Sequence, residues 1–477
     1  MNKRSALIFS VLALLAVASC RREEVPGPAV VPSGEDVDPG REAAEEDPAQ
    51  EPSDDPSDHH SDDTEDKTRT RSGEIPKVYI TTASSIWSKD IYVPGSMRLV
   101  DSDGWYSDLK DTTMAIQIKG RGQSTWGNPK KPYRIKLEGK AKVLGMKKNR
   151  DWDIIANYND KSQMRNKLGM KVSKIMDLPW TPKHRTCELY LNGAYKGTCD
   201  VFQHKEVAGE KVDINPIVPM MSPDAGDFYL EVESNEADFR TKTPGFQIPI
   251  KFKDPEKAEL SDSQIQYIKD WMASMEAALV ALDFTSTTGY KKYLDIDSFA
   301  RFYIVEEIAK NIDGNLRKSA FMTKEAGKPL ILYHVWDFDL AFGNCDYMHT
   351  EFLPASEGIY GDDPEGFFVK DVNERPSGGK GLMQYLFMDP EFVDTVKNLW
   401  TEAYPELLGL VDFLREEDEV YRPFYEANFD RWYGSNPGAY YWPEPWPPCL
   451  TYDEAFSRMA SFYERRIAWL DSAIPAL

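Results

Sequence analysis

The hydrophobic pattern of the chain changes near residue 255, and this change constrains the fold more than any other feature of the sequence. Before that point, short runs alternate apolar and polar positions, as at residues 78–82, 116–118 and 133–137. Such alternation is typical of half-buried strands. After that point, apolar residues recur at the three- and four-residue spacing of helices. We therefore expect an α+β protein, strand-rich over about 75–254 and helix-rich over about 255–477, with two lobes and a cleft.

Turn and capping signals refine this outline. Asn192-Gly193 separates two strand-like runs and predicts a tight hairpin. Ser261 and Gln264 form a capping box in front of an amphipathic run. Helices are expected at residues 164–176, from 261, from Asp297 or Ser298, and at 452–470.

The cysteine content indicates a fold held by its core and not by disulfides. Five cysteines in 477 residues are too few for a disulfide scaffold. Cys187 and Cys199 flank the predicted hairpin turn almost symmetrically, so they could pair across it in an exported protein. The spacing alone leaves open whether they do.

The first twenty residues indicate export. Lys3 and Arg4 precede an apolar stretch over residues 6–18, which is too short to span a membrane comfortably. The stretch ends in Val-Ala-Ser-Cys, which resembles a bacterial lipoprotein box with Cys20 as the acylated residue. We expect residues 1–20 to be a lipoprotein signal peptide, and the protein to be lipid-anchored outside the cytoplasm, in the outer membrane and facing the periplasm or the surface.

Half of the formal net charge of −22 lies in the segment that follows. Residues 21–72 contain 17 acidic and six basic residues, seven prolines and no aromatic residue. Such a composition cannot bury enough apolar surface to fold, so residues 21–74 are expected to be a disordered acidic tether. A partner-binding tail, or a metal site at His59 and His60, is the alternative. The acidic total argues against a nucleic-acid partner.

A glycine-rich run joins two of the predicted strands. It reads Gly120-Arg-Gly-Gln-Ser-Thr-Trp-Gly127 and is followed by a basic strand at residues 130–137. Glycines allow close approach of a ligand to the backbone, and cationic side chains suit phosphate oxygens. The run matches neither the Walker loop nor the kinase glycine loop. Taken alone, it is equally consistent with a tight hairpin that exposes its lysines.

Three aspartates form a second cluster of interest. Asp313 ends a predicted helix, and Asp337 and Asp339 follow an apolar strand at residues 330–335. Phosphoryl transfer needs one aspartate that orients a hydroxyl group and others that bind Mg²⁺. Capping of helices and turns is the alternative role. A hydrolase that uses Asp337 and Asp339 as paired carboxylates is a weaker alternative, because glycosidase pairs flank their substrate.

Together these segments resemble the spore-coat protein kinase (CotH) family. The resemblance rests on Gly-Arg-Gly-x-Ser-Thr-Trp, Lys-Lys-Pro-Tyr-Arg-Ile-Lys, the hairpin with Asn192-Gly193, and Trp-Asp-Phe-Asp-Leu-Ala-Phe-Gly at 336–343. It implies an atypical bilobal kinase-like fold over residues 75–477. It also implies a phosphotransferase that modifies serine in a protein substrate with ATP and Mg²⁺ or Mn²⁺.

The resemblance assigns the aspartates to catalysis and to metal binding. Asp313 corresponds to the catalytic aspartate that receives the proton of the substrate hydroxyl group. Asp337 corresponds to the metal-binding aspartate, and Asp339 is a second metal ligand.

The resemblance also predicts how the nucleotide is bound. Lys136, Arg121 and Arg165 are the expected phosphate contacts. The positions of Tyr133 and Trp336 suggest that these rings pack on the adenine.

Two positions depart from the kinase pattern. Protein kinases carry a metal-binding Asn five residues after the catalytic Asp, and this chain has Lys318 there. Gln203 stands where many relatives have Glu. A non-catalytic binding or structural lipoprotein that keeps the fold is therefore the second hypothesis, with the aromatic segment 432–446 as a glycan or peptide platform or as a packed loop.

Overall fold

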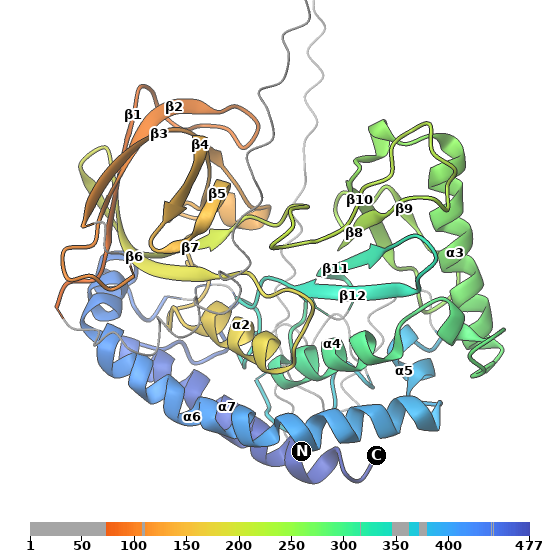
Figure 1. Ribbon diagram of the computed structural model, residues 1–477. Coiled ribbons are helices and arrows are strands. Elements are labelled where there is room, and N and C mark those ends of the chain that lie inside the picture. Colours follow the sequence, from red (N-terminus) through yellow and green to blue (C-terminus); the bar gives the residue numbers. More distant parts are fainter. Residues whose placement is uncertain are drawn as a thin grey trace, which may run out of the picture. The chain divides into compact units, whose positions relative to one another are not determined.

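The computed structural model describes residues 73–106, 110–314, 316–345, 362–371, 379–439, 441 and 443–477. Within this part, a closed barrel and a five-stranded sheet stand on either side of Figure 1, with long helices running beneath both. The predicted signal peptide with Cys20, and residues 21–72 of the predicted tether, lie outside the described residues. No helix of the described part is long and apolar enough to cross a membrane.

Seven strands form the barrel in the order β1-β2-β3-β4-β5-β7-β6. Neighbouring strands are antiparallel except β1 and β6, whose parallel pairing closes the barrel. Alternation along β4 buries Ile135 and Leu137, whereas Arg134 and Lys136 are only partly buried. The strands are β1 (Lys77–Thr82), β2 (Val93–Val100), β3 (Asp111–Gly120), β4 (Tyr133–Val143), β5 (Met146–Ile155), β6 (His184–Leu191) and β7 (Ala194–Gln203).

The second sheet combines strands from both halves of the sequence. Its order is β12-β11-β8-β10-β9, so β11 pairs with β8 although helices separate them in the chain. Two strands of this sheet follow residue 255, within the predicted helix-rich half, and one of them is the apolar strand expected at residues 330–335. The strands are β8 (Phe228–Glu233), β9 (Phe239–Arg240), β10 (Pro249–Asp254), β11 (Lys318–Lys324) and β12 (Leu330–Val335).

Helices pack beneath and beside the two sheets (Figure 1). The longest, α6, has 43 residues and contains Pro405 and Pro423. The sequence pattern did not predict it. The α-helices are α2 (Arg165–Ile175), α3 (Asp262–Val280), α4 (Ile296–Ala309), α5 (Leu382–Leu386), α6 (Pro390–Trp432) and α7 (Tyr452–Ala473). The short 3-10 helices are η2 (Ser124–Gly127), η3 (Lys257–Glu259) and η4 (Tyr290–Lys292).

Most of the local signals are confirmed. The hairpin of β6 and β7 turns at Asn192-Gly193, where Gly193 has φ +78°. Ser261 caps α3 through a capping box. The cap of α4 is Asp295, two residues before the earlier of the two predicted positions.

The two cysteines of the hairpin face each other but are not bonded. Cys187 and Cys199 are direct cross-strand partners, as the symmetric spacing suggested. Both are buried and carry free thiols. The hairpin is thus held by its strand pairing and by the core.

Candidate functional site

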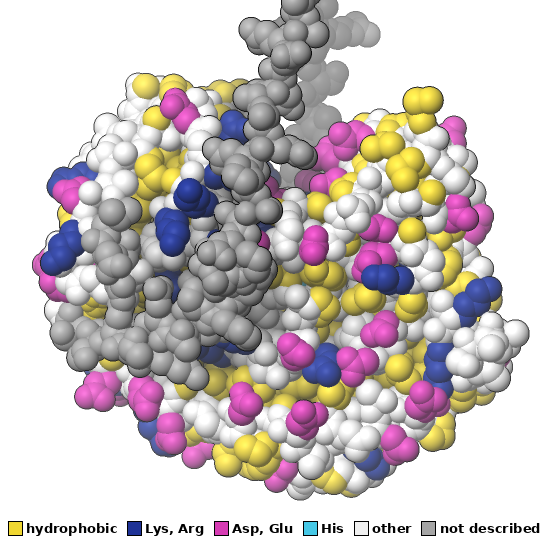
Figure 2. All heavy atoms as spheres, viewed as in Figure 1, with side chains coloured by type: hydrophobic (Ala, Val, Ile, Leu, Met, Phe, Trp, Pro, Cys, Tyr) yellow, Lys and Arg dark blue, Asp and Glu magenta, His cyan; other side chains and the backbone are white. Residues whose placement is uncertain are grey.

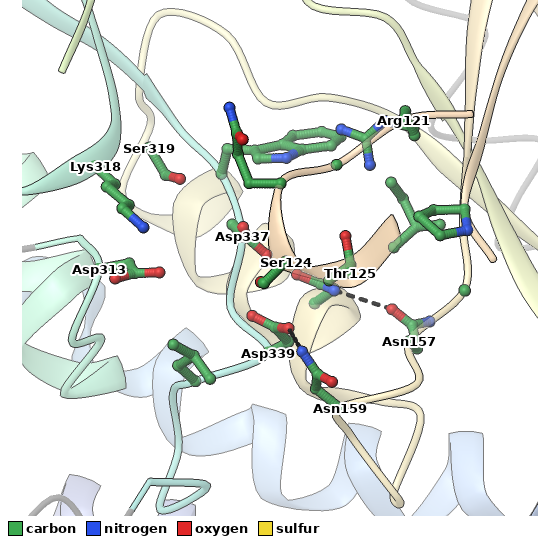
Figure 3. A pocket seen from close by; sticks show the side chains of 18 of the residues that line it. Arg121, Ser124, Thr125, Asn157, Asn159, Asp313, Lys318, Ser319, Asp337 and Asp339 are labelled. Atoms are coloured by element: carbon green, nitrogen blue, oxygen red, sulfur yellow. Dashed lines mark hydrogen bonds between the residues drawn. The ribbon is translucent and has the colours of Figure 1, made fainter. Parts of the chain in front are cut away.

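A cavity of about 500 Å³ lies between the barrel and the second sheet. Its lining includes the glycine-rich run, the segment after β5, one end of α2 and the ends of β8, β11 and β12. Among the residues that the sequence singled out, Arg121, Asp313, Trp336, Asp337 and Asp339 line it. Side chains that are up to 218 residues apart in the chain thus meet in one place (Figure 3).

The glycine-rich run forms the barrel side of the cavity. It leaves β3 at Gly120, and η2 then brings Ser124 and Thr125 to the lining. Gly122 has φ +83°, and a Cβ there would lie 2.1 Å from Oγ1 of Thr125. The glycine is therefore required by the turn that presents these hydroxyl groups to the cavity.

The buried carboxylate of Asp153 holds the guanidinium group of Arg121 in place. Its Nε lies 3.1 Å from Oδ1 of Asp153, and Arg134 approaches the same oxygen at 2.8 Å. His204 donates Nδ1–H to Asp153 over 2.9 Å and accepts from Arg134. Burial lowers the pKa of His204 to about 3, so this ring is neutral. Burial alone would raise the pKa of Asp153, but the two arginines and His204 hold it well below its usual value.

Lys205 is a cavity cation that the sequence reasoning missed. Its Nζ lies 3.6 Å from the centroid of the Trp336 ring, and the guanidinium of Arg121 lies 5.8 Å from the same ring. Burial, and then the nearby Arg121, lower the pKa of Lys205 to about 7. Two cations thus converge on one aromatic ring. The sequence contained no motif that marked Lys205 as a cavity residue, because Lys205 follows the end of β7 and lies outside the glycine-rich run and the aspartate segments.

The segment that carries Asp337 and Asp339 is held by hydrogen bonds on both sides. Asp337 has φ +70°, a left-handed conformation that is uncommon for a residue other than glycine. Asn311 donates its amide to the carbonyl oxygen of Asp337 over 3.2 Å, and Phe338 N–H donates to Oδ1 of Asn166 over 2.8 Å. Helix α2 and the turn that follows α4 therefore fix an otherwise unfavourable backbone.

Asp337 and Asp339 form a carboxylate pair at the base of the cavity. Asn159 donates to Oδ2 of Asp339 over 2.9 Å (Figure 3). Burial, and then the neighbouring Asp337, raise the pKa of Asp339 well above its usual value. Two adjacent carboxylates fit Mg²⁺, which in nucleotide sites takes one or two carboxylates together with water and phosphate oxygens. A dedicated site of three or more His, Cys, Asp or Glu ligands does not occur in the part of the chain that the structure describes.

Asp313 lies apart from this pair, in the turn after α4 (Figure 3). Burial raises its pKa, and so does Asp337, whereas Lys318 opposes the rise. The next residue, Gly314, approaches the buried side chain of Glu306 so closely that a Cβ would lie 1.9 Å from its Oε2. The turn is therefore packed tightly against α4, which fixes the position of Asp313.

Four of the residues considered from the sequence do not line the cavity. Lys136 is on the other face of β4 from the buried residues, opposite Asp151 of β5. Burial raises the pKa of Tyr133 to about 12, and its ring packs against Trp126. Gln203 accepts the backbone N–H of Lys183.

Arg165 is the fourth of these residues, and it supports the site from within the core. It donates to Asp160 over 2.5 Å and to the carbonyl oxygen of Ala341 over 3.1 Å. Its side chain thus fixes the segment after Asp339 and does not face the cavity.

The aromatic segment near residues 432–446 is largely packed in its described part. The Tyr433 hydroxyl donates to the carbonyl oxygen of Tyr158, and Trp432 donates to that of Lys196. Lys161 forms an ion pair with Glu444. This agrees with the packed-loop interpretation for these residues; Tyr440 and Trp442 lie outside the described residues.

Charge differs between the two walls. On the face in Figure 2, several Lys and Arg side chains lie over the barrel, whereas Asp and Glu are more frequent over the second sheet and the helices. In the cavity, Arg121 and Lys205 come from the barrel side, and the other side carries the three aspartates together with Glu231, Glu233, Arg317 and Lys318. A bound anion would therefore meet cations on one side and, on the other, acids able to bind a metal ion.

The chain was compared with known proteins. A family profile described as CotH kinase protein matches residues 117–470, which is more than half of the chain. No curated protein matches the chain.

Proposed function

The chain belongs to the CotH kinase family, and from this premise we propose that it transfers a phosphoryl group from a nucleoside triphosphate to a hydroxyl group of a protein. The observation that carries the proposal is the convergence of Arg121 and Lys205 with Asp313, Asp337 and Asp339 on one cavity. Phosphoryl transfer depends mainly on positioning and charge neutralisation, and these residue types supply both.

In the proposed complex, the phosphates face the barrel side of the cavity. Arg121 and Lys205 would contact phosphate oxygens, and Ser124 and Thr125 would donate from their hydroxyl groups. Arg121 suits this role because Asp153 already holds its guanidinium in place. Trp336 offers an aromatic surface for the base, as the sequence suggested, or for the two cations that lie over its ring.

The proposed metal ligands are Asp337 and Asp339. A bound Mg²⁺ or Mn²⁺ would supply positive charge against the nucleotide phosphates. The pair is suited to this because two adjacent carboxylates, of which Asp339 is buried and Asp337 partly buried, repel each other without a cation between them. Asn159 would fix the orientation of Asp339 through the hydrogen bond to its Oδ2.

Asp313 is the proposed base. The acceptor hydroxyl oxygen attacks the γ-phosphorus, and the bond from this phosphorus to the bridging oxygen of the β-phosphate breaks. The hydroxyl proton passes to Asp313, and the nucleoside diphosphate leaves. The raised pKa of Asp313 favours its acceptance of a proton, provided that the carboxyl group is ionised at the start of the reaction.

The proposal includes a fold assignment and a location. The barrel and the second sheet would be the two lobes of an atypical kinase-like fold, with the nucleotide between them. On the sequence evidence at residues 1–20, the protein would be held at the cell envelope through a lipid on Cys20, with the acidic segment as a tether.

Nucleotide binding tests the proposal without any knowledge of the protein substrate. ATP with Mg²⁺ should raise the unfolding temperature of the protein more than either does alone, because a ligand at 100 times its Kd stabilises by about 2.7 kcal/mol. Asp337→Ala should abolish the added effect of Mg²⁺. The control Asp394→Ala, on an exposed position of α6, should retain it. A wild-type protein that ATP and Mg²⁺ leave unchanged would favour the non-catalytic alternative.

A further inference from the structure

Lys318 lines the cavity and follows Asp313 by five residues, the spacing at which protein kinases carry a metal-binding Asn. It is the first residue of β11, and its backbone N–H donates to the carbonyl oxygen of Asp313 over 2.8 Å. Its side chain lines the cavity, and in Figure 3 its ammonium group points toward the Asp313 carboxylate.

The three aspartates of the cavity are divided into a pair and a single acid, and Glu231 and Glu233 also line it. Asp337 and Asp339 lie together, and Asp313 lies apart from them with Lys318 beside it (Figure 3). Among the described residues, no group of three or more His, Cys, Asp or Glu side chains could hold a metal ion. The close pair of Asp337 and Asp339 thus provides carboxylate ligands for one cation.

The second cation of protein kinases depends on an Asn five residues after the catalytic Asp. The residue at this spacing from Asp313 is Lys318. An ammonium group has three donors and no lone pair, so it cannot bind a metal ion. Its charge also repels a cation that approaches Asp313.

We infer that this site works with a single divalent cation and that Lys318 supplies the second positive charge to the phosphates. The inference rests on the proposed function, because it concerns how the phosphates of a bound nucleotide are neutralised. A lysine ammonium group is a compact charge with rotatable donors, which suits a phosphate oxygen. Lys318 would contact the transferred phosphoryl group from the Asp313 side, opposite Arg121 and Lys205.

Counting bound Mn²⁺ tests this directly. The full-length chain is saturated with a non-hydrolysable ATP analogue, and bound Mn²⁺ is determined from the electron paramagnetic resonance signal of the free ion. We expect one Mn²⁺ per chain. Two Mn²⁺ per chain would overturn the inference and leave the proposed function intact. No analogue-dependent Mn²⁺ at all would overturn both.

Two variants separate the charge of Lys318 from its structural role. Lys318→Met should still bind one Mn²⁺ with the analogue, which shows that the cavity is folded, but should lower the rate of phosphoryl transfer about 100-fold or more. Lys318→Arg should recover part of this loss because it restores the charge. The control Lys328→Met, in the exposed turn between β11 and β12, should match the wild type. A Lys318→Met variant with the wild-type rate, or a Lys318→Arg variant as slow as Lys318→Met, would overturn the inference.

Discussion

Nε of Arg121 lies 3.1 Å from Oδ1 of Asp153, a carboxylate whose side chain is fully shielded from solvent. This contact links the cavity to the barrel wall, because the Asp153 carboxylate also accepts hydrogen bonds from Arg134 and His204. The arginine that faces the cavity is thereby oriented before any ligand arrives. Such preorganisation reduces the entropy that binding would otherwise cost.

Replacement of Asp153 should therefore impair both stability and binding. Asp153→Asn leaves Arg121 and Arg134 without their shared counter-ion, and removal of one partner of a buried pair costs about 3–5 kcal/mol. Urea unfolding at pH 7 should show this loss. The control Asp151→Asn, on the neighbouring outward position of β5, should change the free energy of unfolding by about 0.5 kcal/mol or less.

The stability loss in Asp153→Asn should also depend on pH. The pKa of Asp153 is held well below its usual value in the folded protein. A depressed carboxyl pKa contributes stability above the unfolded value, about 3.9, and this stability is lost as the pH falls through the folded pKa. The stability difference between wild type and Asp153→Asn should therefore shrink between about pH 5 and pH 2. A difference that grows toward acid would contradict the assignment.

Nucleotide affinity should depend on the cations that line the cavity. Arg121→Met and Lys205→Met should each weaken ATP binding about 10- to 150-fold, the range for a charge-assisted hydrogen bond. Lys136→Met, which alters a cation outside the cavity, should bind as the wild type does. Isothermal titration calorimetry measures the ATP affinity of all three variants. The reverse ranking would favour the sequence-based assignment of Lys136 to the phosphates.

The activity should depend on pH through Asp313. The ionised carboxylate accepts the proton, so the rate should rise with pH through the pKa of Asp313. Burial and Asp337 raise this pKa, whereas the charge of Lys318 lowers it. Without the charge of Lys318, that pKa rises further, so the acidic limb of the rate profile should move to higher pH in Lys318→Met. A limb that stays in place or moves to lower pH would argue against Asp313 as the base.

A buried ion pair near the C-terminal end of α4 should control stability. NH2 of Arg466 lies 2.6 Å from Oε1 of Glu307, and both side chains are almost fully buried. Glu307 also accepts the backbone N–H groups of Phe368 and Lys370, so the pair holds that segment against α4 and α7.

Removal of one partner tests this role. Arg466→Met should lower the free energy of unfolding by about 3–5 kcal/mol in urea. The neighbouring Arg465→Met is the matched control, because Arg465 is exposed. An effect of equal size in both variants would show that the loss is not due to the buried pair.

Local sequence signals predicted individual elements well and tertiary placement less well. The turn at Asn192-Gly193 and the capping box at Ser261 depend on neighbouring residues, and both are confirmed. Asp313, Asp337 and Asp339 could be assigned to one site from the sequence only because the family resemblance relates residues that are far apart in the chain.

Two residues that the sequence placed at the phosphates do not line the cavity. Lys136 lies opposite Asp151 of β5, outside the cavity lining. Arg165 was expected at the phosphates too, yet it pairs with Asp160 inside the core. Lys205 could not be identified from the sequence, because its approach to Trp336 depends on how the barrel meets the second sheet.

The long helix α6 was missed for a different reason. Pro405 and Pro423 interrupt its pattern, and proline within a helix usually indicates a break or a kink. Packing of its buried side chains against α4 and α7 outweighs this local cost. The sequence alone gave no measure of that compensation.

The most direct test of the central claim is phosphoryl transfer itself. The purified protein, with γ-labelled ATP, Mg²⁺ or Mn²⁺ and a mixture of envelope proteins, should label a protein on a hydroxyl residue. Asp313→Ala should lower the rate by at least about 100-fold while it still binds ATP. Label incorporated equally by the wild type and Asp313→Ala, or no transfer by a wild type that binds ATP and metal, would contradict the account.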